Sequence, residues 1–238
     1  MSNFPFQRLQ NDLAVLIAKT SAGKKLPSEP YLAKQLGVSR ATLREAMRMF
    51  ETQGKIRRRQ GSGTFVIGQV PVMDTGLEVL ESLETMAKRL GLEVSVSDLQ
   101  VEQVSADAEL AGGLSVDQGT KLTSIRRVIC ENGRPIAYLV DTLPEDFLKP
   151  SDLPASFKGS VLDFLLERGD PTTVSRAAIS ATGAIAEVAK ALQIQRGDVL
   201  LHFVSQLFTA AGRVVDYSVS YFIPGYFRFH VVRRVGSS

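Results

Sequence analysis

The segment 26–67, LPSEPYLAKQLGVSRATLREAMRMFETQGKIRRRQGSGTFVI, most constrains how this chain can fold. Its apolar residues recur at spacings of three and four over 40–53, with Ser39 as an N-cap signal before them and Gly54 as a stop signal after them. Arginines also recur every four residues on a second face of the same pattern. This pattern predicts a helix that packs with one face and is basic on another.

Two further helices are predicted before this one. Apolar residues from Phe6 to Ile17 form the stripe of a first helix, 6–17. Ser28 is positioned to cap a second helix, 29–36, whose first turn tolerates Pro30 because the first N–H groups of a helix have no intrahelical partner. Gly37 ends this short helix and leaves a tight turn before the next.

A basic hairpin follows the three helices. The runs 55–60 (KIRRRQ) and 64–67 (TFVI) flank the turn GSG, whose Gly61 and Gly63 give the backbone freedom and allow close approach to a sugar-phosphate backbone. Two helices joined by a tight turn form a helix-turn-helix, which places the N-terminus of its second helix in the DNA major groove, and the hairpin is then the wing.

The charge distribution agrees with this interpretation. Residues 1–69 hold 12 Lys and Arg against 4 Asp and Glu, whereas residues 70–238 hold 16 against 21. A local positive excess attracts a polyanion through counterion release, and the acidic remainder must serve another purpose. Each feature alone has a plainer explanation, a solvated helix face or an ordinary turn, but their coincidence predicts duplex DNA as the partner.

The residue types suggest separate roles in DNA binding. Arg40 and Arg44 are candidates for base reading, since a guanidinium can donate two hydrogen bonds to guanine O6 and N7. Thr42 and the capped helix start suit a phosphate oxygen. Arg48 lies on the same basic face, and Arg58 on the wing is expected to bind DNA through charge.

The segment 26–66 resembles the GntR family of bacterial transcription regulators over nearly its full length. The resemblance implies a winged helix-turn-helix that binds palindromic operators as a dimer. Pro30 departs from the family, many members of which carry a DNA-contacting arginine there. The complete set of candidate DNA-binding residues is Ser39, Arg40, Thr42, Arg44, Arg48, Arg58, Gln60, Gly61, Ser62 and Gly63.

The remainder of the chain reads as an α+β domain with an antiparallel sheet. We expect a linker at 69–76 and a helix at 77–90. Turn signals at 131–135 and 209–213 predict hairpins. Strands are expected at 94–104, 121–130, 136–143, 174–181, 199–209, 213–223 and 227–233, and shorter helices at 107–112, 160–168 and 185–192.

This second part resembles the UTRA effector domain, which shares its fold with chorismate lyase and accompanies GntR heads in the HutC subfamily. The local matches are IRRVICENGRPIAYLVDTLP, EVAKALQIQRGDVLL and GRVVDYSVSYFIP. The resemblance covers roughly 77–235 and implies a pocket for a small metabolite that changes DNA affinity. The expected domains are a winged helix-turn-helix at 1–68, the linker at 69–76 and the UTRA domain at 77–238.

The resemblance also suggests effector-binding residues. This chain has Ile129, Leu139 and Tyr226 at three positions where members of the family often carry a charged residue. We therefore expect an effector less charged and more apolar than an amino-sugar phosphate. The plainer alternatives are that an arginine only pairs with a carboxylate on the sheet and that a tyrosine is core. The candidate effector residues are Ser82, Arg127, Arg176, Asp216 and Tyr221.

Other reactive side chains give no sign of chemistry. Cys130 is the single cysteine and lies in an apolar strand-like run, where a buried thiol is expected. His202 and His230 are too isolated to suggest a metal site, so we expect no metal and no cofactor. The first residues lack signal-peptide features and no run approaches a membrane span, which indicates a cytoplasmic protein that does not bind membranes.

The sequence therefore favours a ligand-responsive transcription regulator. We expect a homodimeric repressor that a small molecule releases from its operator or retargets on it. One alternative is an enzyme of chorismate lyase-like fold with an attached DNA-binding head, although no acid-base constellation is evident. Another is an architectural DNA binder without a ligand, which the size of the acidic part argues against.

Overall fold

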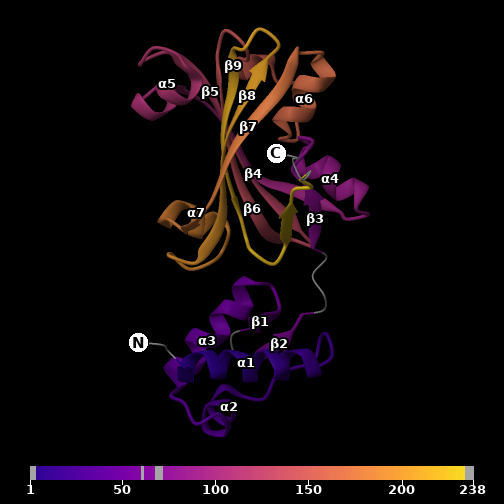
Figure 1. Cartoon of the computed structure of the whole chain (residues 1–238), viewed down its shortest axis with the longest axis vertical. Helices are drawn as coiled ribbons and strands as arrows, with labels where there is room; N and C mark the ends of the chain where they lie inside the picture. The colour runs from indigo at the N-terminus through magenta and orange to yellow at the C-terminus, as the bar shows by residue number, and fades with distance from the viewer. Residues whose placement is uncertain (1–3, 60–61, 68–71, 234–238) are drawn as a thin grey trace, which may run out of the picture. The chain divides into compact units, whose positions relative to one another are not determined.

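The computed structural model describes residues 4–59, 62–67 and 72–233, and the chain divides into two compact units (Figure 1). The first unit contains the chain up to Val72 together with Pro224–Tyr226, and the second contains the rest. In the described parts of the chain, no helix is long and apolar enough to cross a membrane.

The first unit consists of three helices and a hairpin, as the sequence predicts. Leu13, Leu32 and Met47 come from different helices and are almost completely buried together, so the apolar stripes pack on one another. Arg58 pairs with Thr64 in the hairpin register. The elements are α1 (Phe4–Lys19), α2 (Glu29–Gln35), α3 (Arg40–Thr52), β1 (Ile56–Arg59) and β2 (Gly63–Val66).

The two helix starts differ in their capping. Ser39 caps α3 as predicted, because its side chain accepts a hydrogen bond from the N–H of Thr42 at 3.0 Å. Ser28 occupies the N-cap position of α2 but its side chain makes no capping hydrogen bond, so that prediction is wrong. Pro30, in the first turn of α2, has no N–H to donate, which removes one of the donors that a cap uses.

The second unit is built on a six-stranded antiparallel sheet, which confirms the predicted α+β fold class. The strand order is β4-β5-β6-β9-β8-β7. Both predicted hairpins are present: β5 joins β6 through Asn132 and Gly133, and β8 joins β9. The sheet strands are β4 (Val94–Ser105), β5 (Lys121–Glu131), β6 (Arg134–Pro144), β7 (Thr172–Gly183), β8 (Val199–Thr209) and β9 (Val214–Phe222).

Helices cover the two faces of this sheet. Figure 1 shows α4 and α6 on one face and α5 and α7 on the other. Side chains of Asp107 and Ser160 cap the starts of α5 and α6 at the places where the sequence predicts these helices. The helices are α4 (Leu83–Arg89), α5 (Ala108–Leu114), the 3-10 helix η1 (Pro150–Asp152), α6 (Val161–Arg168) and α7 (Ala186–Ala191).

The predicted linker and the helix after it need correction. Within the predicted linker 69–76, residues 69–71 lie outside the described residues, and β3 (Met73–Gly76) forms a strand. It pairs in parallel with β10 (Phe227–His230), which we expected to extend the antiparallel sheet. The helix expected at 77–90 begins only at Leu83, because Ser82 caps it and residues 77–80 are exposed.

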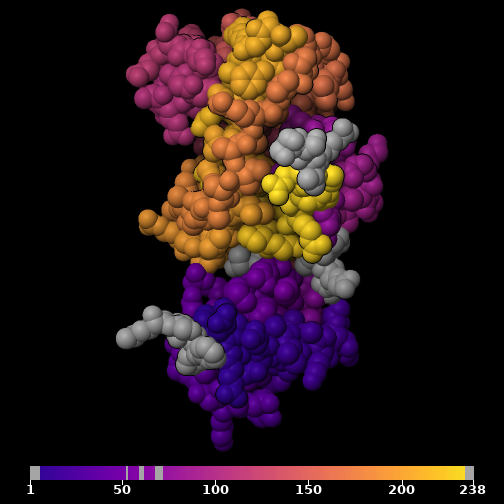
Figure 2. Space-filling model, in the orientation of Figure 1, coloured from indigo at the N-terminus to yellow at the C-terminus, as the bar shows by residue number. Residues whose placement is uncertain are grey.

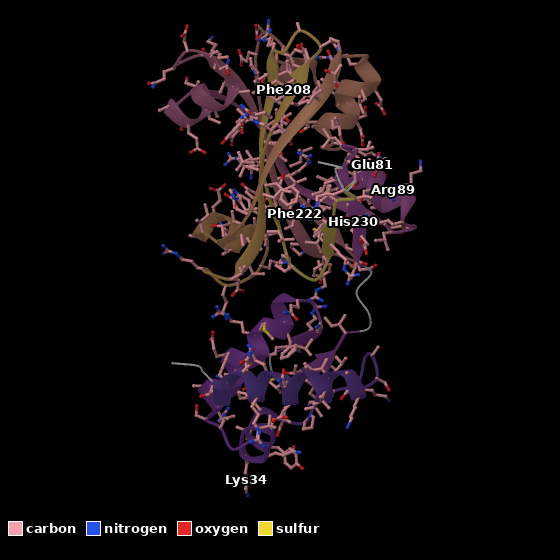
Figure 3. All side chains as sticks on the ribbon, in the orientation of Figure 1. Lys34, Glu81, Arg89, Phe208, Phe222 and His230 are labelled. Carbon is pink, nitrogen blue, oxygen red and sulfur yellow. The ribbon has the colours of Figure 1, made fainter. Side chains whose placement is uncertain are left out.

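Aromatic side chains join β10 to the sheet. The ring centroids of Phe222 and Phe227 lie 4.9 Å apart, and that of Phe229 lies 4.8 Å from Phe203. Phe222, at the end of β9, is labelled in Figure 3. The small two-stranded sheet is therefore held by apolar contacts beyond its own hydrogen bonds.

Candidate functional site

The N-terminal turn of α3 presents polar groups to solvent. Ser39, Arg40 and Thr42 are exposed, and the hydroxyl oxygens of Ser39 and Thr42 lie 2.8 Å apart. The cap uses one acceptor of Ser39 on the helix backbone, while Arg40 extends from the first helical position. This arrangement can offer hydroxyl and guanidinium groups to a phosphate or a base edge.

Two arginines beside this turn are joined by carboxylates. The Nε of Arg44 on α3 donates to Glu29 on α2 at 2.6 Å. The Nε of Arg58 on β1 donates to Glu51 at 2.8 Å, and its backbone N–H donates to the other oxygen of that carboxylate at 3.0 Å. Glu29 also lies 3.9 Å from Arg58, so one carboxylate connects α2, α3 and the wing.

The arginines of these ion pairs differ in how far their side chains are exposed, and a more exposed guanidinium is more available to DNA. The side chain of Arg44 is 55% exposed, whereas those of Arg48 and Arg58 are 28% and 27% exposed. Arg48 also lies 3.6 Å from Glu45. Surface ion pairs of this kind are weak enough for a phosphate or a base to replace the carboxylate. Arg44 is therefore the most available of the three paired arginines.

The predicted wing tip is described only in part. Ser62 is exposed, and Gly63 has φ +109°, a conformation that favours glycine. A Cβ at Gly63 would overlap the end of the Lys25 side chain, which lies against this turn. Gln60 and Gly61 lie outside the described residues. Lys25 was not among the predicted residues, and its closeness to the wing is a tertiary feature.

In the second unit, Arg127 forms a buried ion pair. Its Nη1 donates to Asp141 on β6, and the two side chains are 7% and 12% exposed. Asp216 on β9 is buried beside them and accepts a hydrogen bond from the N–H of Thr142 at 3.2 Å. Arg127 and Asp216 were both predicted, and the structure brings them together on one face of the sheet.

Helices α4 and α6 add three groups to this face. The hydroxyl of Ser82 donates to Asp163 at 2.7 Å and accepts from the N–H of Thr85 at 2.9 Å. Glu84, in the first turn of α4, interacts electrostatically with Arg127, Asp141 and Asp163. The Arg127 cluster is defined here as Ser82, Glu84, Arg127, Asp141, Asp163 and Asp216.

Burial changes the protonation of this cluster. Burial raises the pKa of Asp216 well above its ordinary value, and the neighbouring Asp141 raises it further while Arg127 opposes the change. Burial also raises the pKa of Glu84, again against the attraction of Arg127. The sequence suggested a site poor in polar groups, but the structure places one guanidinium and four carboxyl groups there. Glu84, Asp141 and Asp163 were not predicted from the sequence. In a sequence, a buried Asp or Glu cannot be distinguished from one at the surface.

Two predicted effector residues lie on the opposite face of the sheet. Tyr221 pairs in register with Tyr138 and His202, and its ring centroid lies 4.8 Å from that of His202. Arg176 is exposed on the edge strand β7 and donates to Gln206. Residues paired across neighbouring strands point to the same face of a sheet, and side chains alternate between the faces along a strand. The pairing therefore places Arg176 and Tyr221 on the face opposite to Arg127.

The remaining reactive side chains have structural partners. Cys130 is buried, with its sulfur 3.2 Å from the hydroxyl of Ser97. His202 lies beside Ser180 and Tyr221, and His230 on β10 lies 3.0 Å from Asp74 on β3. Within the described ranges, no group of three or more His, Cys, Asp and Glu side chains is arranged to hold a metal ion.

Comparisons with known protein families agree with this division. Residues 6–66 match the family model for bacterial regulatory proteins of the gntR family, and residues 89–228, over half of the chain, match the UTRA domain. The chain belongs to the GntR family and carries a UTRA domain. The second unit is called the UTRA unit below, and the first is called the GntR head.

Curated relatives align with both parts. The HTH-type transcriptional repressor NagR of Bacillus subtilis (strain 168) is 29% identical over 198 residues, covering 82% of this chain and 79% of the relative. The regulator RB1450 of Rhizobium meliloti (strain 1021) is 30% identical over 212 residues, covering 87% and 84%. The histidine utilization repressor of Pseudomonas putida is 29% identical over 174 residues, covering 73% and 69%.

Solved structures support the fold. PhnF from Mycobacterium smegmatis matches 96% of this chain and 100% of its own, with a TM-score of 0.65 and 22% identity. The effector domain of PhnF, solved alone, matches 68% of this chain and 99% of its own, with a TM-score of 0.62 and 20% identity. At these sequence identities, the similarity supports the fold alone.

Proposed function

We propose that this protein is a transcription repressor whose operator affinity is set by a small molecule bound in the UTRA unit. The observation that carries the proposal is the family membership of both parts, together with the exposed hydroxyl and guanidinium groups on the first turn of α3. Two relatives that span most of the chain are named repressors. The named relatives are regulators, and the enzyme alternative has no comparable support.

The DNA interface in this proposal is the α3 face. Arg40 and Arg44 read base edges in the major groove, Ser39 and Thr42 position the helix start on a phosphate, and the wing follows the neighbouring backbone. Since Pro30 cannot donate a hydrogen bond, the head reads the operator without a contact from that position. Ser62 and Gly63 belong to the wing contact, as do Gln60 and Gly61 by the sequence argument.

A homodimer is part of the proposal, because a palindromic operator needs two heads about 34 to 36 Å apart. Strand β7 supports it: it is an edge strand that leaves Val174 and Ile179 59% and 50% exposed. Figure 2 shows β7, in orange, as an uncovered band across the UTRA unit. An unpaired edge with exposed apolar side chains is a natural place for a second copy.

The effector site in this proposal is the Arg127 cluster. Ser82, Arg127 and Asp216 are the predicted residues retained in it, and Arg176 and Tyr221 are left out. The small molecule changes DNA affinity only if it binds the operator-competent and the incompetent state unequally. By reciprocity, operator DNA then changes the affinity for the small molecule by the same factor.

Selection of genomic fragments by the purified full-length protein tests the function. We expect enrichment of a palindromic sequence over random competitor DNA at moderate salt, with two chains per site by light scattering. A complex of one chain per site would contradict the homodimer. Failure to enrich any sequence, with or without a metabolite extract, would contradict the regulator itself.

A further inference from the structure

The charges around Arg127 are unbalanced. The guanidinium interacts with carboxyl groups from three elements, Glu84 on α4, Asp141 on β6 and Asp216 on β9, and Asp163 on α6 acts on Glu84. The guanidinium already donates to Asp141. If all four carboxyl groups were ionised, the cluster would carry a large negative charge out of water, which is unfavourable without a further cation.

Several buried polar atoms in the cluster lack hydrogen-bond partners. Neither side-chain oxygen of Glu84 is accessible, and apart from its own backbone N–H neither has a partner among the described residues. The Nε of Arg127 is equally inaccessible and unpartnered within the same residues, in a side chain that is 7% exposed. Native proteins rarely leave buried polar atoms unsatisfied, so these atoms are positions where ordered water or a bound molecule supplies the missing hydrogen bonds.

The chemistry of these atoms selects the kind of molecule. The carboxyl oxygens of Glu84 accept hydrogen bonds, and the Nε–H of Arg127 donates one. A phosphate or carboxylate would meet four carboxyl groups and a guanidinium whose charge Asp141 already balances. A protonated nitrogen would instead donate a charge-assisted hydrogen bond to the carboxylate of Glu84, which among the described residues interacts with Arg127 as its only cation.

We propose that the effector is a small organic cation whose amine or amidine nitrogen binds the carboxylate of Glu84 and whose acceptor group faces the Nε of Arg127. This inference rests on the proposed function, since it names the ligand class of the same site. Asp163 strengthens the attraction for the cation and is itself held by Ser82. The hydroxyl of Ser82 thus positions a charge and does not need to touch the ligand.

Proton release is an expected consequence of this binding mode. Burial raises the pKa of Glu84, and a bound cation opposes this shift because it favours the ionised form, so binding favours loss of a proton from Glu84. The charged groups that face Glu84 are Arg127 from β5, Asp141 from β6 and Asp163 from α6, and Asp216 from β9 acts on Asp141. Cation affinity therefore rises with pH above the ordinary glutamate range.

Matched probes on the full-length protein test the charge of the ligand. Three amines are compared with their neutral and anionic counterparts by thermal shift and calorimetry. The sets are glucosamine, glucose and glucose 6-phosphate; 4-amino-1-butanol, 1,4-butanediol and 4-hydroxybutyrate; and tyramine, tyrosol and 4-hydroxyphenylacetate. We expect at least one amine to stabilise the protein, with proton release seen in buffers of different ionisation enthalpy, and its counterparts not to do so.

Two variants locate the effect. Glu84→Gln keeps the shape of the side chain and removes its charge, so amine binding should weaken about tenfold to a hundredfold. Glu93→Gln is the control, because Glu93 is exposed shortly after α4 and should leave binding unchanged. Stabilisation by the anions, the absence of any amine effect, or equal amine binding by Glu84→Gln would each overturn the proposal.

The outcome can be separated from that of the proposed function. Operator binding is measured on the same preparations by gel shift. Specific DNA binding without any amine effect overturns the inference about ligand charge alone. Loss of specific DNA binding in the wild-type protein overturns the proposed function, whatever the amines do. Stabilisation by magnesium or calcium ions in place of the amines would also count against an organic cation.

Discussion

The GntR head and the UTRA unit both contain arginine-carboxylate networks, and they differ in their access to water. In the head, Glu29 connects Arg44 and Arg58 at the surface, and the pairs can exchange for phosphates or bases. In the UTRA unit, Arg127 and Asp141 are buried, and the pKa of the neighbouring Asp216 is raised by burial. The same chemistry thus gives exchangeable contacts in one unit and a fixed charge balance in the other.

The largest expected effect is on the buried network. Arg127→Ala leaves Asp141 and Asp216 buried without their guanidinium, and we expect the free energy of unfolding of the UTRA unit to fall by about 3–5 kcal/mol. Urea denaturation followed by circular dichroism measures this change. Arg126→Ala is the matched control on the other sheet face, where Arg126 pairs with Glu102 and Glu187 near the surface. It should cost about 0–1 kcal/mol, and equal losses would break the comparison.

The next effect concerns base reading by the head. Arg44→Ala should weaken binding to the cognate operator by about 1–3 kcal/mol and blur sequence preference. Arg8→Ala removes the same charge from an exposed position on α1 and should preserve preference. Fluorescence anisotropy with operator and scrambled duplexes measures both. If Arg44→Ala discriminated as well as the wild type, the placement of α3 in the major groove would be wrong.

The pH dependence of stability should reveal the buried acid. Because the pKa of Asp216 is raised in the folded state, that state retains a proton that the unfolded state loses. The free energy of unfolding should therefore fall as pH rises from the ordinary aspartate range through the folded-state pKa, by up to about 1.4 kcal/mol per pH unit for one proton. Urea denaturation at several pH values measures this dependence, and the free energy of unfolding of Asp216→Asn should change less with pH than that of the wild type. The exposed control Asp117→Asn should keep the wild-type slope.

The smallest expected effect sharpens the contrast within the head. Arg58→Ala should weaken all duplexes alike and reduce the slope of affinity against salt by about one. Glu51 and Glu29 already neutralise part of its charge, so its loss should cost less than that of Arg44. Salt titrations with operator and random DNA measure the slope. A change in sequence preference would show that Arg58 reads bases.

The two units also differ in how far the sequence predicts them. In the head, Ser39, the arginines of α3 and the wing lie within a short segment, so local helix and turn signals place them together. In the UTRA unit, Ser82 and Asp163 meet across 81 residues. Figure 3 labels the two residues of a local contact, Glu81 and Arg89, which lie only eight residues apart in the sequence.

Strand register decided which predicted effector residues share a site. The sequence placed Tyr221 and Asp216 on the same strand, but side chains alternate between the faces of a sheet, and an odd separation puts them on opposite faces. Arg176 lies on an edge strand whose pairing with β8 is irregular near its start. The odd spacing of Asp216 and Tyr221 is visible in the sequence, but the register that places Arg127 on the face of Asp216 is not, because cross-strand pairing fixes it.

The sequence by itself determined the division into a basic head and an acidic α+β unit, the three helices with their wing, and both hairpins. Those features follow from periodicity, caps and turns, which act over a few residues. The tertiary structure alone decided that Met73–Gly76 pairs with Phe227–His230, that three carboxyl groups converge on Arg127 and that Asp163 lies beside one of them, Glu84. Such contacts depend on which distant segments pack together, and burial then gives ordinary carboxylates their unusual charge state.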